Sequence, residues 1–207
     1  MFYTEKLIFI HISLTGGSSV STAFGQEKGP KQFNGVTIPA HATALEVRKI
    51  MGDDEWSKRY SFTIVRNPWD KMVSIFHSWC REMKLKKHWG DKWQDVFNKT
   101  RNFESFLLNY PYENVSGMTG TIRTSQNYWA FGVDRIFMYE DFDELSVFMT
   151  ELGFSGEILY TPRFDNFSGQ EYKRPDIPYQ NYYTKNLRDL VSTWFEEDIK
   201  LFGYSFD

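Results

Sequence analysis

With 207 residues, the chain is long enough for one domain with a sizeable core, which we predict over residues 1–207. Its net charge of −3 provides no field that would attract nucleic acid or an anionic membrane. The single cysteine, Cys80, excludes an internal disulfide framework, and because the apolar runs are too short for a signal peptide or a membrane span, we expect a cytoplasmic protein.

Residues 7–12 form an apolar, β-branched run that predicts a buried strand, and His11 inside it is interpreted as a core histidine. Residues 15–19 follow as a Thr-Gly-Gly turn and two serines that open a helix. Such a turn presents backbone N–H groups to a phosphate or sulfate, although the pattern also fits an ordinary strand-to-helix turn. Residues 25–35, with Gly, Pro and Lys, are predicted to be a surface loop.

His41 lies just before a stretch with near-helical spacing, residues 44–51, which ends at Gly52. At a helix entry the chain can direct an imidazole into a cleft, where it can take a proton from a hydroxyl group near neutral pH. The alternative for His41 is a capping or purely structural role.

A second apolar strand, residues 61–65, places Arg66 at its carboxyl end. Asn67 suits a helix N-cap and Pro68 the first helical position, so a helix should begin there. Its apolar stripe consists of Trp69, Met72, Val73, Phe76, Trp79, Cys80 and Met83. Because ligands of open α/β sheets bind outside the carboxyl ends of the strands, Arg66 is a candidate anion ligand.

Later in the chain, residues 134–139 predict a third strand and residues 142–152 a helix. Thr184 is predicted to cap one last helix that ends at Gly203. This alternation of strands and helices favours an α/β fold with a mainly parallel sheet flanked by helices. Candidate ligand contacts of lower weight are Arg123, Ser125 and Gln126.

Residues 9–19 and 65–74 resemble the two cofactor-binding motifs of the sulfotransferases that use 3′-phosphoadenosine 5′-phosphosulfate (PAPS), in particular the carbohydrate sulfotransferases. The resemblance spans nearly the whole chain and implies a P-loop-like fold. It also implies that the first motif holds the 5′-phosphosulfate and the second the 3′-phosphate. The residues so implied are Thr15, Gly16, Gly17, Ser18 and Ser19 in the first motif, and Arg66 and Ser74 in the second.

The same resemblance gives His41 the role of the base and implies that a later loop closes over the cofactor, where Lys173 or Arg174 would contact it. The chain departs from the family at one place. The first motif usually reads Pro-Lys-Thr-Gly-Gly, and here Ser13 and Leu14 stand for Pro and Lys. Loss of such a cation costs roughly 3–4 kcal/mol of transition-state stabilisation. Either another cation replaces it, or the protein is slow, or it binds without catalysing.

We therefore expect an enzyme that transfers a sulfuryl group from PAPS to a hydroxyl group, with a carbohydrate as the expected acceptor, and releases 3′-phosphoadenosine 5′-phosphate (PAP). The partner that carries the hydroxyl group is expected to be a glycan or a small molecule. No metal site is predicted. The alternative is a module that binds the nucleotide or a sulfated ligand without turnover, because of Leu14. A P-loop kinase or NTPase is a third hypothesis, disfavoured because the Gly-x-x-x-x-Gly-Lys-[Ser/Thr] pattern is absent from the sequence.

Overall fold

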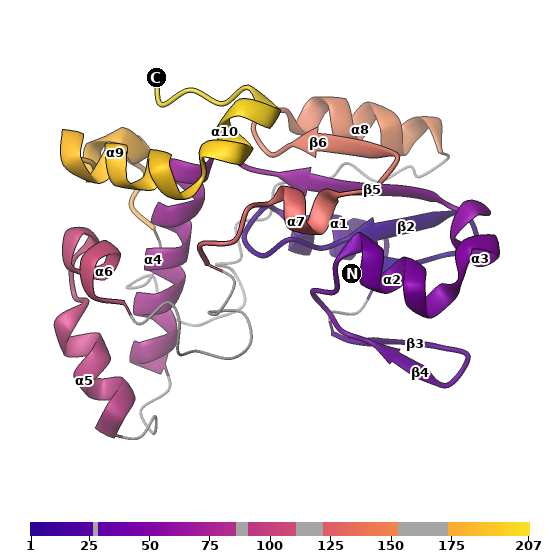
Figure 1. Ribbon diagram of the computed structural model, residues 1–207, viewed down its shortest axis with the longest axis horizontal. Coiled ribbons are helices and arrows are strands. Elements are labelled where there is room, and N and C mark those ends of the chain that lie inside the picture. The colour runs from indigo at the N-terminus through magenta and orange to yellow at the C-terminus, as the bar shows by residue number, and fades with distance from the viewer. Residues whose placement is uncertain (27–28, 86–90, 111–121, 153–173) are drawn as a thin grey trace. The chain divides into compact units, whose positions relative to one another are not determined.

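The computed structural model describes residues 1–26, 29–85, 91–110, 122–152 and 174–207 (Figure 1). The chain divides into two compact units. The first is formed by residues 1–66 and 125–163, and the second by residues 67–124 and 164–207. Because this division describes local packing, the single domain expected over residues 1–207 stays a prediction.

The first unit is built on a four-stranded sheet with the order β1-β2-β5-β6 (Figure 1). β2 (Leu7–Ile10), β5 (Tyr60–Val65) and β6 (Arg135–Met138) are parallel, and β1 (Phe2–Tyr3) pairs with β2 in the antiparallel sense. The carboxyl ends of the three parallel strands therefore meet at one edge of the sheet. The predicted α/β fold with a mainly parallel sheet is confirmed.

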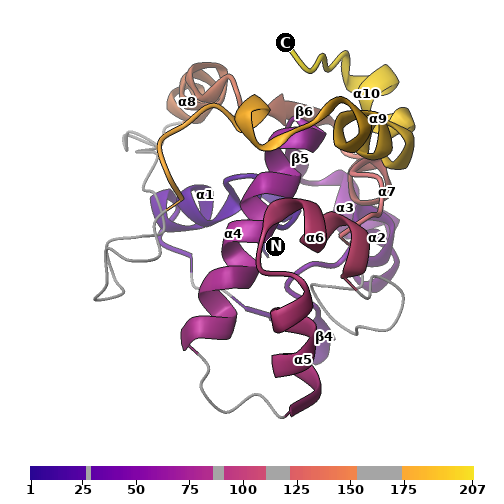
Figure 2. The same ribbon diagram turned by 90° about the vertical axis from the view of Figure 1, so that its left-hand side faces the viewer.

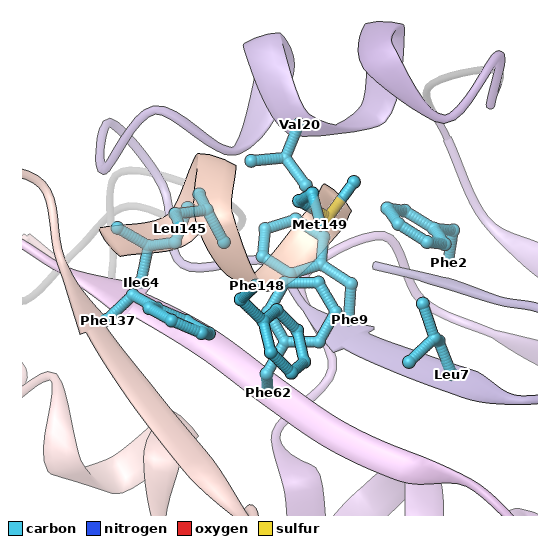
Figure 3. Close-up of a cluster of buried hydrophobic side chains, with 10 residues drawn as sticks. All are labelled: Phe2, Leu7, Phe9, Val20, Phe62, Ile64, Phe137, Leu145, Phe148 and Met149. Atoms are coloured by element: carbon cyan, nitrogen blue, oxygen red, sulfur yellow. The ribbon is translucent and has the colours of Figure 1, made fainter. Parts of the chain in front are cut away.

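Both faces of this sheet are buried, which explains the continuous apolar runs in the sequence. One face lies under α1 (Gly17–Ala23) and α8 (Phe142–Glu151). Figure 3 shows its core, made of Phe2, Leu7, Phe9, Val20, Phe62, Ile64, Phe137, Leu145, Phe148 and Met149. Ile8, Ile10 and Val65 alternate with these residues and are equally buried on the opposite face.

Three further helices belong to the first unit: α2 (Ala44–Met51), α3 (Asp53–Ser57) and α7 (Asn127–Ala130). α2 begins at a capping box, in which the Thr43 hydroxyl accepts from the Glu46 N–H and the Glu46 carboxylate accepts from the Thr43 N–H. The predicted helix after His41 is thus confirmed at both ends.

A hairpin stands in place of the C-terminal part of the surface loop predicted over residues 25–35. Its strands are β3 (Lys31–Phe33) and β4 (Val36–Ile38), which pair antiparallel. Asn34 and Gly35 connect them with φ angles of 47° and 81°. Positive φ at both central residues is typical of the two-residue hairpin turn that an Asn-Gly pair favours, so this part of the loop prediction was wrong.

The second unit is helical. It contains α4 (Pro68–Leu85), α5 (Asp91–Lys99), α6 (Phe103–Asn109), a 3-10 helix (Tyr179–Tyr182), α9 (Lys185–Trp194) and α10 (Glu196–Phe202). α5, α6 and α9 pack against α4 (Figure 2).

Two of the predicted helix boundaries in this unit can be compared with the structure. α4 starts as predicted, because the Asn67 side-chain oxygen accepts from the Trp69 N–H at 3.1 Å. The single last helix predicted after Thr184 is wrong in one respect, since it is broken at Phe195 into α9 and α10. Among the helices of the described ranges, none has the length and apolarity that crossing a bilayer requires.

Candidate functional site

The turn between β2 and α1 is shaped by its own side chains and backbone. Leu14 has a φ of 63° and Gly16 a φ of 86°, both in the left-handed region that L-residues other than glycine rarely adopt. Thr15 is fully buried, and its hydroxyl donates to the Ile12 carbonyl at 2.9 Å. The Thr15 side chain therefore closes the turn, and any contact of this residue with an anion falls to its N–H group.

Neither glycine of the turn can be replaced without a clash. A Cβ atom on Gly16 would lie 2.7 Å from the Phe142 ring, and one on Gly17 would lie 2.2 Å from Cδ2 and 2.5 Å from Nε2 of His11. The N–H groups of Ser19 and Val20 bond to the Gly16 carbonyl, at 2.9 and 3.5 Å. The N–H groups before them precede the first helical hydrogen bond and face outward, which suits an anion.

Arg66, at the carboxyl end of β5, lies at this turn. Its side chain is almost fully buried, with 7% of the residue exposed. One terminal nitrogen, Nη1, donates to the Leu14 carbonyl at 3.0 Å, and the guanidinium carbon lies 3.9 Å from the centre of the Tyr139 ring. The structure thus brings together the predicted Arg66 and the predicted Thr-Gly-Gly turn within one unit.

Gln126 holds the backbone of Arg66. It is fully buried, its side-chain oxygen accepts from the Arg66 N–H at 2.9 Å, and its side-chain nitrogen donates to the Arg66 carbonyl at 2.8 Å. From the sequence, Gln126 was a candidate ligand contact. In the structure its amide forms both of these bonds, so it acts on Arg66 as a neighbouring strand would.

His41 is held by its ring and by its backbone. Its Nδ1 lies 2.9 Å from the His11 carbonyl and 3.3 Å from the Ser13 hydroxyl, and the indole N–H of Trp129 donates to the His41 carbonyl at 3.0 Å. Because a carbonyl only accepts, the contact with His11 assigns the proton of a neutral His41 to Nδ1. Nε2 then carries the lone pair, which is the form that a general base requires.

His11 belongs to the same group, although the sequence analysis placed it in the core. β2 ends at Ile10, and the partly buried ring of His11 packs on Phe9, at 5.7 Å, and on His41, at 4.8 Å between ring centres. A signal for this placement was present in the sequence. His11 shares the period-2 register of Leu7 and Phe9, which points it to the side of the sheet that α1 covers.

Ser74 lies on α4, in the second unit, beside Arg174. Nη1 of Arg174 donates to the Ser74 hydroxyl at 3.0 Å, and Nη2 pairs with the Asp70 carboxylate at 2.7 Å. Since Arg66 is in the first unit, the implied assignment of Arg66 and Ser74 to one phosphate stays a prediction. Lys173 falls outside the described residues.

One turn further along α4, His77 pairs with Tyr182. The His77 Nε2 atom lies 2.8 Å from the Tyr182 hydroxyl. Burial, with a smaller contribution from the positive charge of Arg174, lowers the pKa of His77 to about 4. Burial also raises the pKa of Tyr182. Both groups of the pair are therefore neutral at physiological pH, and a single hydrogen bond joins the hydroxyl to the imidazole.

The chemistry that these groups offer is anion binding and proton acceptance. Outward N–H groups and a buried guanidinium lie at the turn, and the His41 imidazole, with its proton on Nδ1, belongs to the same unit. Within the described ranges, no group of three or more His, Cys, Asp or Glu residues could hold a metal ion.

Comparison with known proteins gives one match. The model of a family described as the sulfotransferase family matches residues 1–205. No curated protein and no solved structure is significantly similar to the chain. The matched residues span both compact units and include the turn, Arg66 and His41.

Proposed function

Since the chain belongs to the sulfotransferase family and is a sulfotransferase enzyme, we propose that it transfers a sulfuryl group from PAPS to a hydroxyl group of a carbohydrate. The donor is proposed from the two motifs around residues 15–19 and Arg66. The acceptor class is proposed from the likeness of the His41 segment to carbohydrate sulfotransferases. The proposal depends most on one observation: His41 Nδ1 donates to the His11 carbonyl, which assigns the lone pair of the neutral ring to Nε2.

The residues at the turn fit the phosphosulfate end of this donor. Glycine at positions 16 and 17 lets the backbone approach an anion closely, and a side chain at either position would clash. The N–H groups at the start of α1 and the hydroxyl groups of Ser18 and Ser19 would hold the 5′-phosphosulfate. The motif assigns the 3′-phosphate to Arg66 and Ser74, and we propose the same roles here. Lys173 or Arg174 is proposed as a further contact, and Arg174 donates to the Ser74 hydroxyl.

When bound, PAPS supplies an activated sulfuryl group whose bond to the 5′-phosphate breaks as the acceptor oxygen bonds to sulfur. His41 Nε2 takes the proton of the acceptor hydroxyl in the same step. The outward N–H groups of the turn stabilise the charge that develops on the phosphate. Because the protein makes no covalent bond, its work is positioning and charge stabilisation, which supply most of the rate in comparable transfers.

A nucleotide-binding module without turnover is the second candidate, and Leu14 is the observation that favours it. The backbone of Leu14 takes part in the turn through its carbonyl, which accepts from Arg66, but its side chain carries no charge. The family lysine would stabilise the leaving phosphate, so a chain that lacks it needs another cation for efficient transfer.

The test is sulfuryl transfer from radiolabelled PAPS to a panel of glycans and small hydroxyl compounds. We expect the wild type to label a carbohydrate, and His41→Ala to lower kcat by about 10²–10⁴-fold, as loss of a general base does. Affinity for PAP, measured by calorimetry, should be the same in both proteins and serves as the control for folding.

Three results would contradict this proposal. Transfer by Leu14→Lys alone would identify the natural protein as a binder. Full activity of His41→Ala would show that His41 is not the general base. Tighter binding of ATP with Mg²⁺ than of PAP would favour a kinase or NTPase instead.

A further inference from the structure

We propose that Asp70 is a positioning residue for the 3′-phosphate, because its carboxylate holds the Arg174 guanidinium beside Ser74. This inference rests on the proposed function, which assigns the 3′-phosphate of PAPS to Ser74 with Arg174 as a further contact. Asp70 lies within the second motif stretch, residues 65–74, but neither the resemblance nor the sequence pattern gives it a role.

Asp70 and Ser74 lie on one face of α4. They are four residues apart on this helix, so their side chains are neighbours on its surface. Arg174 bridges the two, since its Nη2 pairs with the Asp70 carboxylate at 2.7 Å and its Nη1 donates to the Ser74 hydroxyl at 3.0 Å. All three residues belong to the second unit. One guanidinium therefore joins a carboxylate to the hydroxyl group that the proposed function assigns to the phosphate.

The two bonds of Arg174 differ in strength. The bond to Asp70 joins two charged groups, whereas Ser74 is a neutral acceptor, and hydrogen bonds between charged groups are the stronger kind. A phosphate that arrives at Ser74 should therefore replace the hydroxyl as the partner of Nη1, while Nη2 stays on Asp70. The Ser74 hydroxyl has a proton of its own, so it and Nη1 would both donate to the phosphate.

The chain that follows Arg174 is attached to the same helix. The Tyr182 hydroxyl lies 2.8 Å from His77 Nε2, and the Tyr183 hydroxyl donates to a carbonyl of α4 at 2.8 Å. These bonds hold the backbone of the segment, but the long Arg174 side chain is ordered by its own contacts. Without the carboxylate of Asp70, this ordering would have to occur when the nucleotide binds, which lowers affinity.

A simpler role for Asp70 is to stabilise α4. It lies in the first turn of this helix, where an acidic side chain interacts favourably with the helix dipole. That role does not involve Arg174, and it would affect the binding of every nucleotide to the same extent. The two roles therefore differ in their effect on PAP relative to adenosine 5′-phosphate, which lacks the 3′-phosphate.

The experiment measures the affinities of these two nucleotides by calorimetry in wild type, Asp70→Asn, Arg174→Ala and the double variant. We expect Asp70→Asn to lower the affinity for PAP by about 3–10-fold, the cost of ordering one long side chain, and to leave that for adenosine 5′-phosphate unchanged. In the Arg174→Ala background the same substitution should cause no further loss, because Asp70 acts through Arg174.

Asp70→Glu is the matched control. It keeps the carboxylate and should retain most of the preference for PAP. A second readout needs no nucleotide. In NMR spectra of the wild type, the bond to Asp70 should slow the rotation of the Arg174 guanidinium, and Asp70→Asn should release it.

The outcomes separate the two proposals. A wild type that binds PAP no more tightly than adenosine 5′-phosphate would overturn the PAPS donor of the proposed function and, with it, the role of Asp70. A wild type that prefers PAP would leave the proposed function standing. The role of Asp70 alone would then be overturned if Asp70→Asn kept or strengthened this preference, or if it weakened PAP binding equally with and without Arg174.

Discussion

Two clusters of polar side chains, one in each unit, are held by different kinds of partner. In the turn cluster, defined here as His11, Leu14, Thr15, His41 and Arg66, side chains bond to the main chain. The Thr15 hydroxyl donates to the Ile12 carbonyl, the His41 imidazole to that of His11 and the Arg66 guanidinium to that of Leu14.

In the α4 cluster, defined here as Asp70, Ser74, His77, Arg174 and Tyr182, side chains bond to one another. Arg174 donates to the Ser74 hydroxyl and pairs with the Asp70 carboxylate, and His77 pairs with Tyr182. A bond to the main chain fixes the local backbone whether or not a ligand is bound. A bond between two side chains can be exchanged for a ligand by a change of rotamer, so the turn cluster is expected to be preformed and the α4 cluster to adapt.

The largest effect on stability is expected at Gln126, whose side-chain amide bonds to the main chain of Arg66 in the way that a neighbouring strand would. Gln126→Ala leaves both the N–H and the carbonyl of Arg66 without this buried partner, at about 1–3 kcal/mol for each group. We expect the free energy of unfolding to fall by roughly 2–4 kcal/mol in a denaturant titration, with a large loss of PAP affinity.

Gln126→Glu is the matched comparison of equal size, since it keeps an acceptor for the Arg66 N–H but sets a carboxylate oxygen against the Arg66 carbonyl, so it should also be destabilised. If Gln126→Ala is as stable as the wild type, the main-chain support of the turn cluster is not needed and the contrast between the clusters is lost.

The next effect tests the close approach of His11 to the turn. Gly17→Ala places a Cβ atom 2.2 Å from the His11 ring, and overpacking of this kind costs about 1–3 kcal/mol. Unfolding in denaturant should reveal this loss. In His11→Ala/Gly17→Ala the ring is absent, so the added methyl group should cost much less than it does beside the ring. Equal costs in the two backgrounds would contradict the contact.

Helix starts and buried strands were predicted from the sequence, because their signals come from residues that are close together along the chain. Capping at Thr43 and at Asn67 and the apolar runs of β2 and β5 are local signals, and each placed its element within a few residues. The Asn34–Gly35 pair is also a local signal, typical of a hairpin turn. The hairpin was nevertheless not predicted, because the polar residues around this pair indicated a loop.

Partners far apart along the chain were not predictable in the same way. Gln126 is 60 positions from Arg66, Arg174 is 100 from Ser74, and Tyr182 is 105 from His77. No local spacing rule relates residues this distant, since their pairing is decided by tertiary packing. In the α4 cluster, the sequence therefore indicated Ser74 and Arg174 as single residues but not their contact, nor the roles of Asp70, His77 and Tyr182. In the turn cluster, the motif indicated several members together.

A smaller effect is expected from pH in the α4 cluster. Because burial lowers the pKa of His77 to about 4, the folded state binds this proton less readily than the unfolded state does. The stability linked to His77 is present above the unfolded pKa of about 6.5 and is lost as the pH falls toward about 4. Because His77 is only partly buried, we expect the free energy of unfolding to fall by roughly 1–2 kcal/mol between about pH 7.5 and pH 5.

His77→Gln offers the Tyr182 hydroxyl both a donor and an acceptor and does not titrate, so the pH dependence of its unfolding should be flatter than that of the wild type by this amount. Identical pH slopes in thermal or denaturant melts would show that His77 is not buried in solution.

The smallest effect is expected from Arg174→Ala. Its ion pair with Asp70 is partly exposed, with 20% and 13% of the two side chains accessible, so its loss should cost about 1 kcal/mol of stability or less. If the α4 cluster exchanges partners for the 3′-phosphate, the variant should bind PAP about 10-fold more weakly, as loss of one charged hydrogen bond predicts. Affinity for adenosine 5′-phosphate, which lacks the 3′-phosphate, should not change.

Arg174→Lys is the matched control and should keep most of the difference in affinity between PAP and adenosine 5′-phosphate. Equal weakening for both would mean that Arg174 only supports α4, and the contrast with the preformed turn would then rest on structure alone.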